Sequence, residues 1–176
     1  MDKNGDAVER VPTGEMKGDG IYRQVGRMAP AGGAHIFLGQ PNIFFVTVNA
    51  KDRIPWIGQA TVQSALVRLW QEEATAWLVG YYLLMPDHVH FFCAPRDLRF
   101  DIDRWIMFWK RQFSRQHLDR EWEWQRRAFH HRMRNRTEDE EKLAYVRENP
   151  LRKNLVQATQ EWHFQGRIHD LRWTTD

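Results

Sequence analysis

The hydrophobic pattern of the chain alternates between strand-like and helix-like periods from about residue 42 onward. Apolar residues at every second position, or continuous apolar runs bounded by turn residues, predict strands over 42–48, 77–84 and 88–93. Apolar residues spaced three and four apart predict helices over 61–74 and 102–117. A short turn containing proline and aspartate separates the second and third strands, so these two strands are expected to form a hairpin.

The remaining elements complete a known arrangement. A fourth strand is expected over 126–133, and a third helix is expected to begin at Thr137 and run toward Pro150, since Thr137-x-x-Glu140 is a capping-box pattern. The order β-α-β-β-α-β followed by a helix predicts an α+β fold of the ferredoxin-like, split-βαβ type. Its antiparallel sheet would carry two helices on one face and an added C-terminal helix. Residues 164–173 are expected to pack as a C-terminal extension, to which the sequence gives no function.

Length and composition limit the class of protein. The 176 residues suffice for one domain with a core, which we place over 36–176, after a Gly-containing, flexible N-terminal tail over 1–35. The longest apolar stretch, 77–85, is about half the length of a bilayer span, so no membrane partner is expected. The single cysteine, Cys93, excludes an internal disulfide framework and fits a reducing compartment. These features predict a soluble, cytoplasmic domain.

Positive charge is concentrated in residues 99–136, which contain eleven Arg or Lys against five Asp or Glu and also four of the nine tryptophans. Cations neutralise phosphates, and aromatic faces stack on unpaired bases, so nucleic acid is the leading partner class. A solvated helix face above a Trp-rich core is an equally good explanation of this pattern. The basic residues expected to contact nucleic acid are Arg104, Arg111 and Arg115, on one helix face, and Arg126, Arg127 and Arg132.

Candidate chemistry is concentrated at His88 and His90. Side chains alternate along a strand, so both imidazoles face one side of the sheet, where two neutral rings can hold a divalent metal. Tyr145 and Asn149 lie four positions apart on the third helix and share a face. A phenol becomes an effective nucleophile toward a phosphodiester when a metal polarises the phosphate, and an amide oxygen can add a ligand. Solvent-facing histidines, a packing tyrosine and a helix-ending asparagine remain the alternative explanation.

Three sequence blocks occur in an order that favours a metal site with a tyrosine nucleophile over packing or solvent-facing residues. They are MPDHVHF at 85–91, WQRRAF at 124–129 and YVRENPLRKNLV at 145–156. Together, over about residues 36–160, they resemble the REP-associated tyrosine transposases, which belong to the single-tyrosine HUH transposases. The chain departs from the family in one place, since Asn154 stands where the family has Gly, and Asn also tolerates a left-handed helix terminus.

The resemblance implies an HUH nuclease fold that cleaves and rejoins single-stranded DNA beside a hairpin. It implies that His88 and His90 are metal ligands, that Asn149 completes the site, and that Tyr145 forms a 5′-phosphotyrosine and leaves a free 3′-hydroxyl. The implied metal is Mg²⁺ or Mn²⁺; imidazole ligands favour Mn²⁺, whereas cellular abundance favours Mg²⁺. Relatives include monomers and homodimers, and both states stay open for this chain.

Two other functions fit part of the sequence. A non-catalytic, domesticated nucleic-acid-binding protein would keep the basic stretch and would have no need of Tyr145. A metal-dependent phosphoester hydrolase would activate a water molecule, form no protein adduct and tolerate loss of the arginines. Formation of a covalent adduct with a hairpin oligonucleotide distinguishes the transposase from both alternatives.

Overall fold

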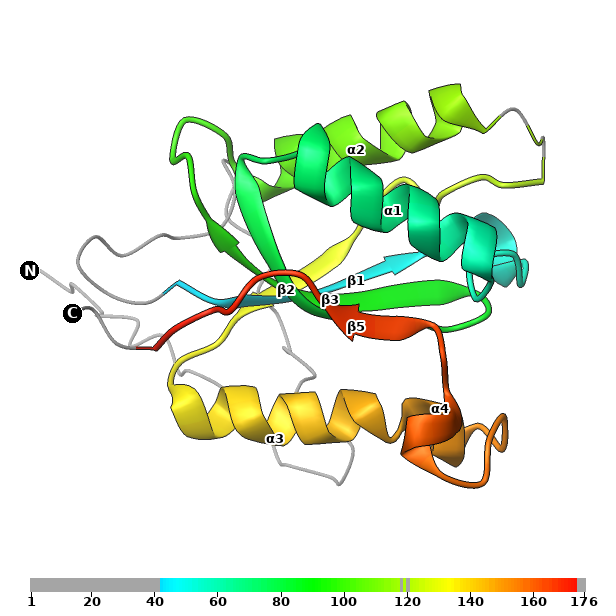
Figure 1. Cartoon of the computed structure of the whole chain (residues 1–176). Helices are drawn as coiled ribbons and strands as arrows, with labels where there is room; N and C mark the ends of the chain where they lie inside the picture. Colours follow the sequence, from blue (N-terminus) through cyan, green and yellow to red (C-terminus); the bar gives the residue numbers. More distant parts are fainter. Residues whose placement is uncertain (1–41, 118, 120, 174–176) are drawn as a thin grey trace, which may run out of the picture.

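The computed structural model describes residues 42–117, 119 and 121–173, and the tail predicted over 1–35 lies outside these residues. A five-stranded antiparallel sheet lies between two helical layers (Figure 1). Its strand order is β4-β1-β3-β2-β5. The strands are β1 Phe44–Asn49, β2 Trp77–Leu84, β3 His88–Pro95, β4 Phe129–Arg132 and β5 Gln165–Arg167.

The helices are divided between the two faces of the sheet (Figure 1). Helices α1 (Ala60–Glu72) and α2 (Ile102–Gln116) cover one face, and α3 (Arg136–Arg147) and α4 (Asn149–Arg152) lie on the other. The described residues also contain two short 3₁₀ turns, η2 (Lys51–Arg53) and η3 (Thr159–Glu161). Since β3 lies between β1 and β2, and β4 flanks β1, the ferredoxin-like order is confirmed.

Alternating side chains give the sheet two separate cores. In β1, Phe44, Val46 and Val48 pack into the core beneath α1 and α2, as the two-residue period predicts. The intervening Phe45 enters a second core on the α3 side, together with Val146 of that helix. The sheet is therefore buried on both faces, and α3 is held against it by apolar contacts.

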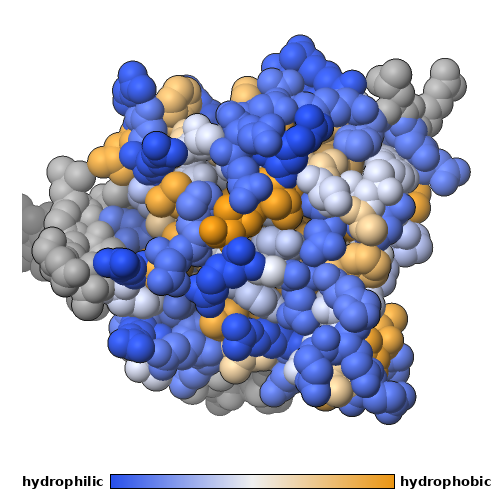
Figure 2. Space-filling view, in the orientation of Figure 1, coloured by the Kyte–Doolittle hydropathy of each residue, from blue (hydrophilic) through white to orange (hydrophobic). Residues whose placement is uncertain are grey.

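Most of the surface in the orientation of Figure 1 is hydrophilic, with one apolar patch near the middle of the view and smaller ones toward its edges (Figure 2). No helix in the described part of the chain combines the length and the apolar character that a membrane span requires.

The predicted beginning of the third helix is wrong. The helix is capped by Asn135, whose side chain accepts a hydrogen bond from the backbone N–H of Glu138 at 2.9 Å, so Thr137 lies inside the first turn. Asparagine is among the strongest N-cap residues, and it takes the role that the Thr137 capping box was expected to play. The helix also ends earlier than expected, because Pro150 has no N–H for a continuing helix and instead lies in the first turn of α4.

The C-terminal segment contains a strand that the sequence analysis missed. Strand β5 pairs with β2, where Leu83 lies opposite Gln165 and Tyr81 lies opposite Arg167. The indole of Trp162 also donates a hydrogen bond to the carbonyl of Leu84 at 2.8 Å. The expected packing of this extension is confirmed, and the extension forms one edge of the sheet.

Asn154 has the left-handed conformation expected from the sequence, with φ of 54°. It ends α4 in a Schellman motif, since the Leu155 N–H bonds to the Pro150 carbonyl and the Asn154 N–H bonds to the Leu151 carbonyl. Asn154→Val is expected to lower the free energy of unfolding by about 1–2 kcal/mol, because a β-branched side chain is strained there. Asn154→Gly is the matched control and is expected to keep the wild-type stability. Urea unfolding followed by tryptophan fluorescence measures both, and equal stability of the two variants would contradict the argument.

Candidate functional site

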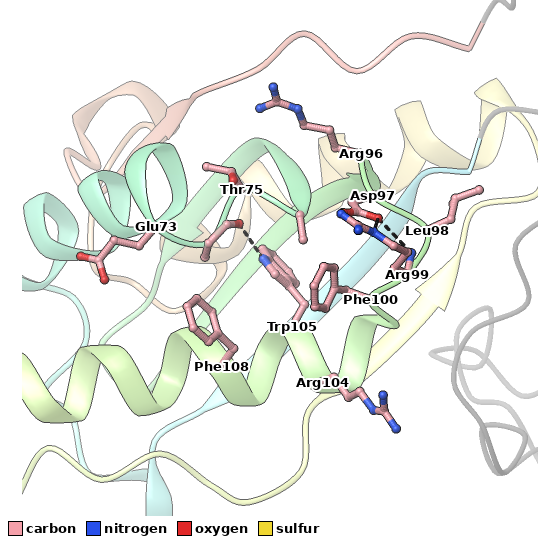
Figure 3. Close-up of a pocket in the computed structure, with 12 residues that line it drawn as sticks. Glu73, Thr75, Arg96, Asp97, Leu98, Arg99, Phe100, Arg104, Trp105 and Phe108 are labelled. Carbon is pink, nitrogen blue, oxygen red and sulfur yellow. Dashed lines mark hydrogen bonds and ion pairs between the residues drawn. The ribbon is translucent and has the colours of Figure 1, made fainter.

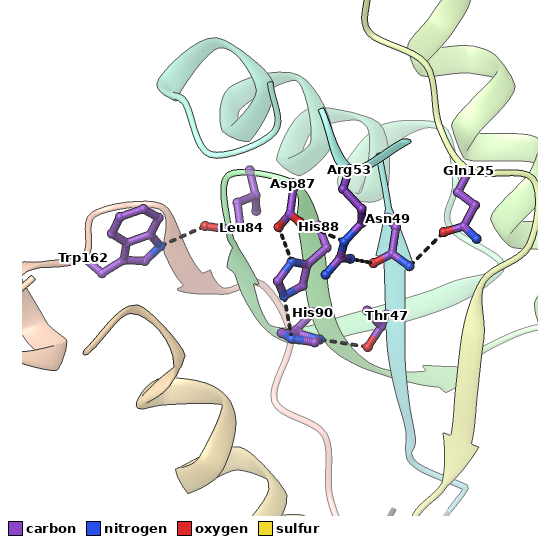
Figure 4. Close-up of polar contacts among 9 residues, drawn as sticks. All are labelled: Thr47, Asn49, Arg53, Leu84, Asp87, His88, His90, Gln125 and Trp162. Atoms are coloured by element: carbon purple, nitrogen blue, oxygen red, sulfur yellow. Dashed lines mark hydrogen bonds and ion pairs between the residues drawn. The ribbon is translucent and has the colours of Figure 1, made fainter. Parts of the chain in front are cut away.

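Two histidines of β3 face each other on the α3 side of the sheet. The Nε2 atoms of His88 and His90 are 3.0 Å apart (Figure 4). Val89 between them points into the opposite core, as strand alternation predicts. Two nitrogen ligands at about 2.1 Å from one ion, set at right angles, are separated by about 3.0 Å. The spacing of the two Nε2 atoms therefore fits two adjacent positions in the coordination shell of one metal ion.

The other nitrogen of each ring is held by a polar neighbour (Figure 4). The Nδ1 atom of His88 lies 2.6 Å from Oδ1 of Asp87, and Nδ1 of His90 lies 2.8 Å from the hydroxyl of Thr47. Thr47 stands directly opposite His90 in the pairing of β1 with β3. Such partners fix the orientation of a metal-binding imidazole and leave its Nε2 atom as the ligand.

The electrostatic surroundings keep both imidazoles neutral. Burial lowers the pKa of His88, although the hydrogen bond and the negative charge of Asp87 oppose this effect. Burial also lowers the pKa of His90 well below its usual value, and the positive charge of Lys142 acts in the same direction. Burial therefore favours the neutral form of both imidazoles, which is the form that a metal ion would require.

Tyr145 is brought to the same side of the sheet by α3. Its side chain is 42% exposed, and its ring packs beneath the ammonium of Lys142 at 5.2 Å and the guanidinium of Arg152 at 4.7 Å. Lys142 also lies 4.5 Å from the ring centre of Phe45, which is 5.2 Å from the ring centre of His90. The phenol is thus linked to the histidine pair by a short chain of contacting side chains.

Asn149 is not joined to the histidines by a hydrogen bond. It is the first residue of α4, and its backbone carbonyl accepts the N–H of Lys153 at 3.0 Å. Across residues 42–117, 119 and 121–173, no group of three or more His, Cys, Asp or Glu side chains is placed to hold a metal. The role of Asn149 as an additional ligand therefore stays a prediction.

The predicted basic residues are divided between different parts of the molecule. Arg104, Arg111 and Arg115 project from the exposed side of α2, on the sheet face opposite the histidines. Arg126 and Arg127 precede β4, and Arg132 ends this strand at the edge of the sheet. The helix face was predicted correctly, whereas its position on the layer opposite the histidines was not foreseen.

A chain of polar contacts connects the two layers along the end of β1. The guanidinium of Arg53 pairs with Asp87 at 2.9 Å and donates a hydrogen bond to the side-chain carbonyl of Asn49 (Figure 4). The amide of Asn49 donates to the side chain of Gln125 at 2.9 Å, and the Gln125 backbone carbonyl accepts from Lys110 of α2. These contacts extend from His88 to the arginine-bearing helix.

A cavity lies near the Pro95 end of β3, away from the histidines. Its volume is about 810 Å³, and the rings of Phe100, Trp105 and Phe108 surround it (Figure 3). Arg96, Arg99 and Arg104 also line it, and Arg99 is paired with Asp97 at 2.6 Å. Because β3 runs from His88 at one end to Pro95 at the other, this cavity is separate from the histidine pair.

Sequence reasoning missed Asp87, Thr47, Arg53 and Lys142. A carboxylate adjacent to His88 in the sequence was a signal that Asp87 could orient the ring, yet this residue was interpreted only as part of a turn. Thr47 reaches the site through the pairing of β1 with β3, and Arg53 reaches it through the backbone turn after β1. The spacing of apolar residues in the sequence predicts neither contact.

The structure therefore combines a ferredoxin-like sheet, a histidine pair on one strand and a tyrosine-bearing helix on the same face of the sheet. Comparison with solved structures finds a REP-associated tyrosine transposase bound to a REP hairpin, with a TM-score of 0.61 and 19% sequence identity. The match covers 74% of this chain and 79% of that chain, and it confirms the expected fold. No family model matches the chain, and no curated protein matches it.

Proposed function

We propose that this protein is a transposase-like HUH endonuclease that cleaves and rejoins single-stranded DNA next to a hairpin. One observation carries the proposal. The Nε2 atoms of His88 and His90 lie 3.0 Å apart, and the Nδ1 atom of each ring contacts a polar side chain, Asp87 or Thr47. The tyrosine-bearing helix lies on the same face of the sheet. The solved transposase with the same fold is bound to a REP hairpin, which supports DNA as the partner.

The residues present fit a divalent ion. His88 and His90 would hold Mg²⁺ or Mn²⁺ through Nε2, and Asn149 is the proposed additional ligand. The bound ion supplies Lewis-acid polarisation of the scissile phosphate. The protein supplies the orientation of the rings, through Asp87 and Thr47, and keeps them neutral through burial.

Tyr145 is the proposed nucleophile. Its Oη forms a bond to the phosphorus while the bond from phosphorus to the 3′ oxygen breaks; the phenol proton leaves to solvent, and the 3′ oxygen takes up a proton. The products are a 5′-phosphotyrosine and a free 3′-hydroxyl. Because a phosphodiester is exchanged for another phosphoester, a 3′-hydroxyl can later attack the adduct and rejoin the strand.

The DNA is proposed to lie along the polar connection between the two helical layers. The hairpin stem would contact Arg104, Arg111 and Arg115 on α2, and the strand leading from it would pass Arg126 and Arg127 near β4. Arg132 lies on the same edge strand. The contacts from Lys110 through Gln125 and Asn49 to Arg53 support this proposed path, because they lead from α2 toward the histidines.

Two differently labelled oligonucleotides test the proposed function. A hairpin with single-stranded flanks is incubated with the full chain and Mn²⁺. A 3′-end label is expected to become attached to the protein on a denaturing gel, whereas a 5′-end label is expected in a shorter, protein-free strand. Released DNA without labelled protein indicates the hydrolase, and binding without cleavage indicates the non-catalytic module; either result contradicts the proposal.

The arginines of α2 give a prediction for affinity. Replacing both Arg111 and Arg115 by Ala is expected to weaken hairpin binding roughly tenfold or more at about 0.1 M salt, because two phosphate contacts are lost. The slope of log affinity against log salt should become shallower by about 1.8 for duplex contacts. Fluorescence anisotropy in EDTA measures both quantities. Arg167→Ala, on β5 at the sheet edge opposite β4, is the control. An unchanged slope in the double variant would exclude α2 from the DNA interface.

A further inference from the structure

The turn that follows β1 is strained at two consecutive residues. Asp52 has φ of 53° and Arg53 has φ of 60°, a left-handed conformation that non-glycine residues seldom adopt. Backbone hydrogen bonds on both sides hold the turn, from Lys51 N–H to the Glu123 carbonyl at 2.8 Å and from Ile54 N–H to the Lys51 carbonyl at 3.2 Å. Such strain persists where the surrounding structure fixes a side chain in one place.

The side chain fixed by this turn is that of Arg53. Its Nε atom lies 2.9 Å from Oδ2 of Asp87, and its Nη1 group donates to the side-chain carbonyl of Asn49 (Figure 4). The side chain is nevertheless 55% exposed. Among the residues that the structure describes, its Nη2 group has no hydrogen-bond partner. The guanidinium is therefore held on one side and presents free N–H groups on the other.

The surroundings of Arg53 favour an anion. Asp87, its ion-pair partner, uses one oxygen for Arg53 and the other for His88. Arg53 and Lys153 both act on His88 as positive charges, so cations flank the histidine pair. A guanidinium whose orientation is already fixed matches the planar fork of a phosphate and loses little side-chain freedom when it binds.

We propose that Arg53 binds a backbone phosphate of the single-stranded DNA segment that lies beside His88 and His90. The inference rests on the proposed function, since it needs DNA at this site. Arg53 is then a binding and positioning residue. The strained turn and Asp87 fix the orientation of its guanidinium, and the guanidinium fixes the position of the DNA strand relative to the histidine pair.

Binding measurements in EDTA test this assignment without metal or catalysis. Two DNAs are compared by fluorescence anisotropy, the hairpin alone and the same hairpin with single-stranded flanks. Arg53→Ala is expected to weaken binding of the flanked hairpin roughly tenfold and to make its salt slope shallower by about 0.7, the value for one phosphate contact in a single strand. Affinity for the bare hairpin should stay at the wild-type value.

Arg167→Ala is the matched control, because Arg167 is also an exposed arginine paired with an aspartate, Asp170, and it lies on β5, the sheet edge opposite β4. Arg53→Lys, which keeps the charge, is expected to retain the salt slope with intermediate affinity, and it serves as the test if Arg53→Ala does not fold. An unchanged salt slope in Arg53→Ala, or a slope in Arg53→Lys as shallow as that expected for Arg53→Ala, overturns the assignment. A wild-type chain that does not bind the hairpin overturns the proposed function instead.

Discussion

The Tyr145→Phe variant is expected to form no covalent adduct with hairpin DNA, a loss of roughly a thousandfold or more in the rate of cleavage. The substitution removes the oxygen that we propose as the nucleophile and leaves the rest of the side chain in place. The ring contacts with Lys142 and Arg152 do not involve the hydroxyl, so the fold and the affinity for DNA should be unchanged. The 3′-labelled hairpin on a denaturing gel measures the adduct, and anisotropy in EDTA measures binding.

Tyr81→Phe is the control for this experiment. Tyr81 belongs to the core on the same face of the sheet, and its hydroxyl donates to the side chain of Gln165 at 2.6 Å. This variant is expected to keep adduct formation, because its hydroxyl is engaged in the structure. An adduct formed by Tyr145→Phe would show that another residue is the nucleophile, and the assignment of Tyr145 would be abandoned.

The order of elements was predictable because it depends on local periods. The two-residue alternation of β1 and the apolar stripe of α2, including Ile106 and Trp109, are properties of short segments, and both were predicted correctly. Strand β5 was not predictable in this way, because Gln165–Arg167 has no apolar alternation. It becomes a strand through pairing with Tyr81–Leu83 of β2, which is a tertiary effect.

In the candidate site, too, some features follow from local sequence periods and others depend on tertiary pairing. Both histidines were expected on one face because they lie two residues apart on a strand, and the structure brings their Nε2 atoms together. The groups that orient them depend on longer-range geometry: Thr47 reaches His90 through the register of β1 with β3, and Arg53 reaches Asp87 through a strained turn. Sequence periodicity identifies which face a side chain occupies, and strand register decides what it meets there.

Loss of His88 is expected to remove metal binding from the isolated protein. His88→Ala should weaken Mn²⁺ binding about a hundredfold or more, because one of the two proposed ligands is deleted. Asp87→Asn should weaken it about tenfold, since the carboxylate that orients Nδ1 and increases the basicity of the ring is replaced by a neutral amide. Electron paramagnetic resonance of free Mn²⁺ measures both constants without DNA.

His163→Ala is the control, because His163 is an exposed histidine whose ring takes part in no hydrogen bond among the described residues. It should bind Mn²⁺ as the wild type does. The order of affinities, wild type above Asp87→Asn above His88→Ala, separates a metal site from a polar cluster that merely stabilises the fold, provided that urea unfolding gives these variants the stability of the wild type. Wild-type Mn²⁺ affinity in His88→Ala would show that the ion binds elsewhere, and the proposed role of the histidine pair would then be lost.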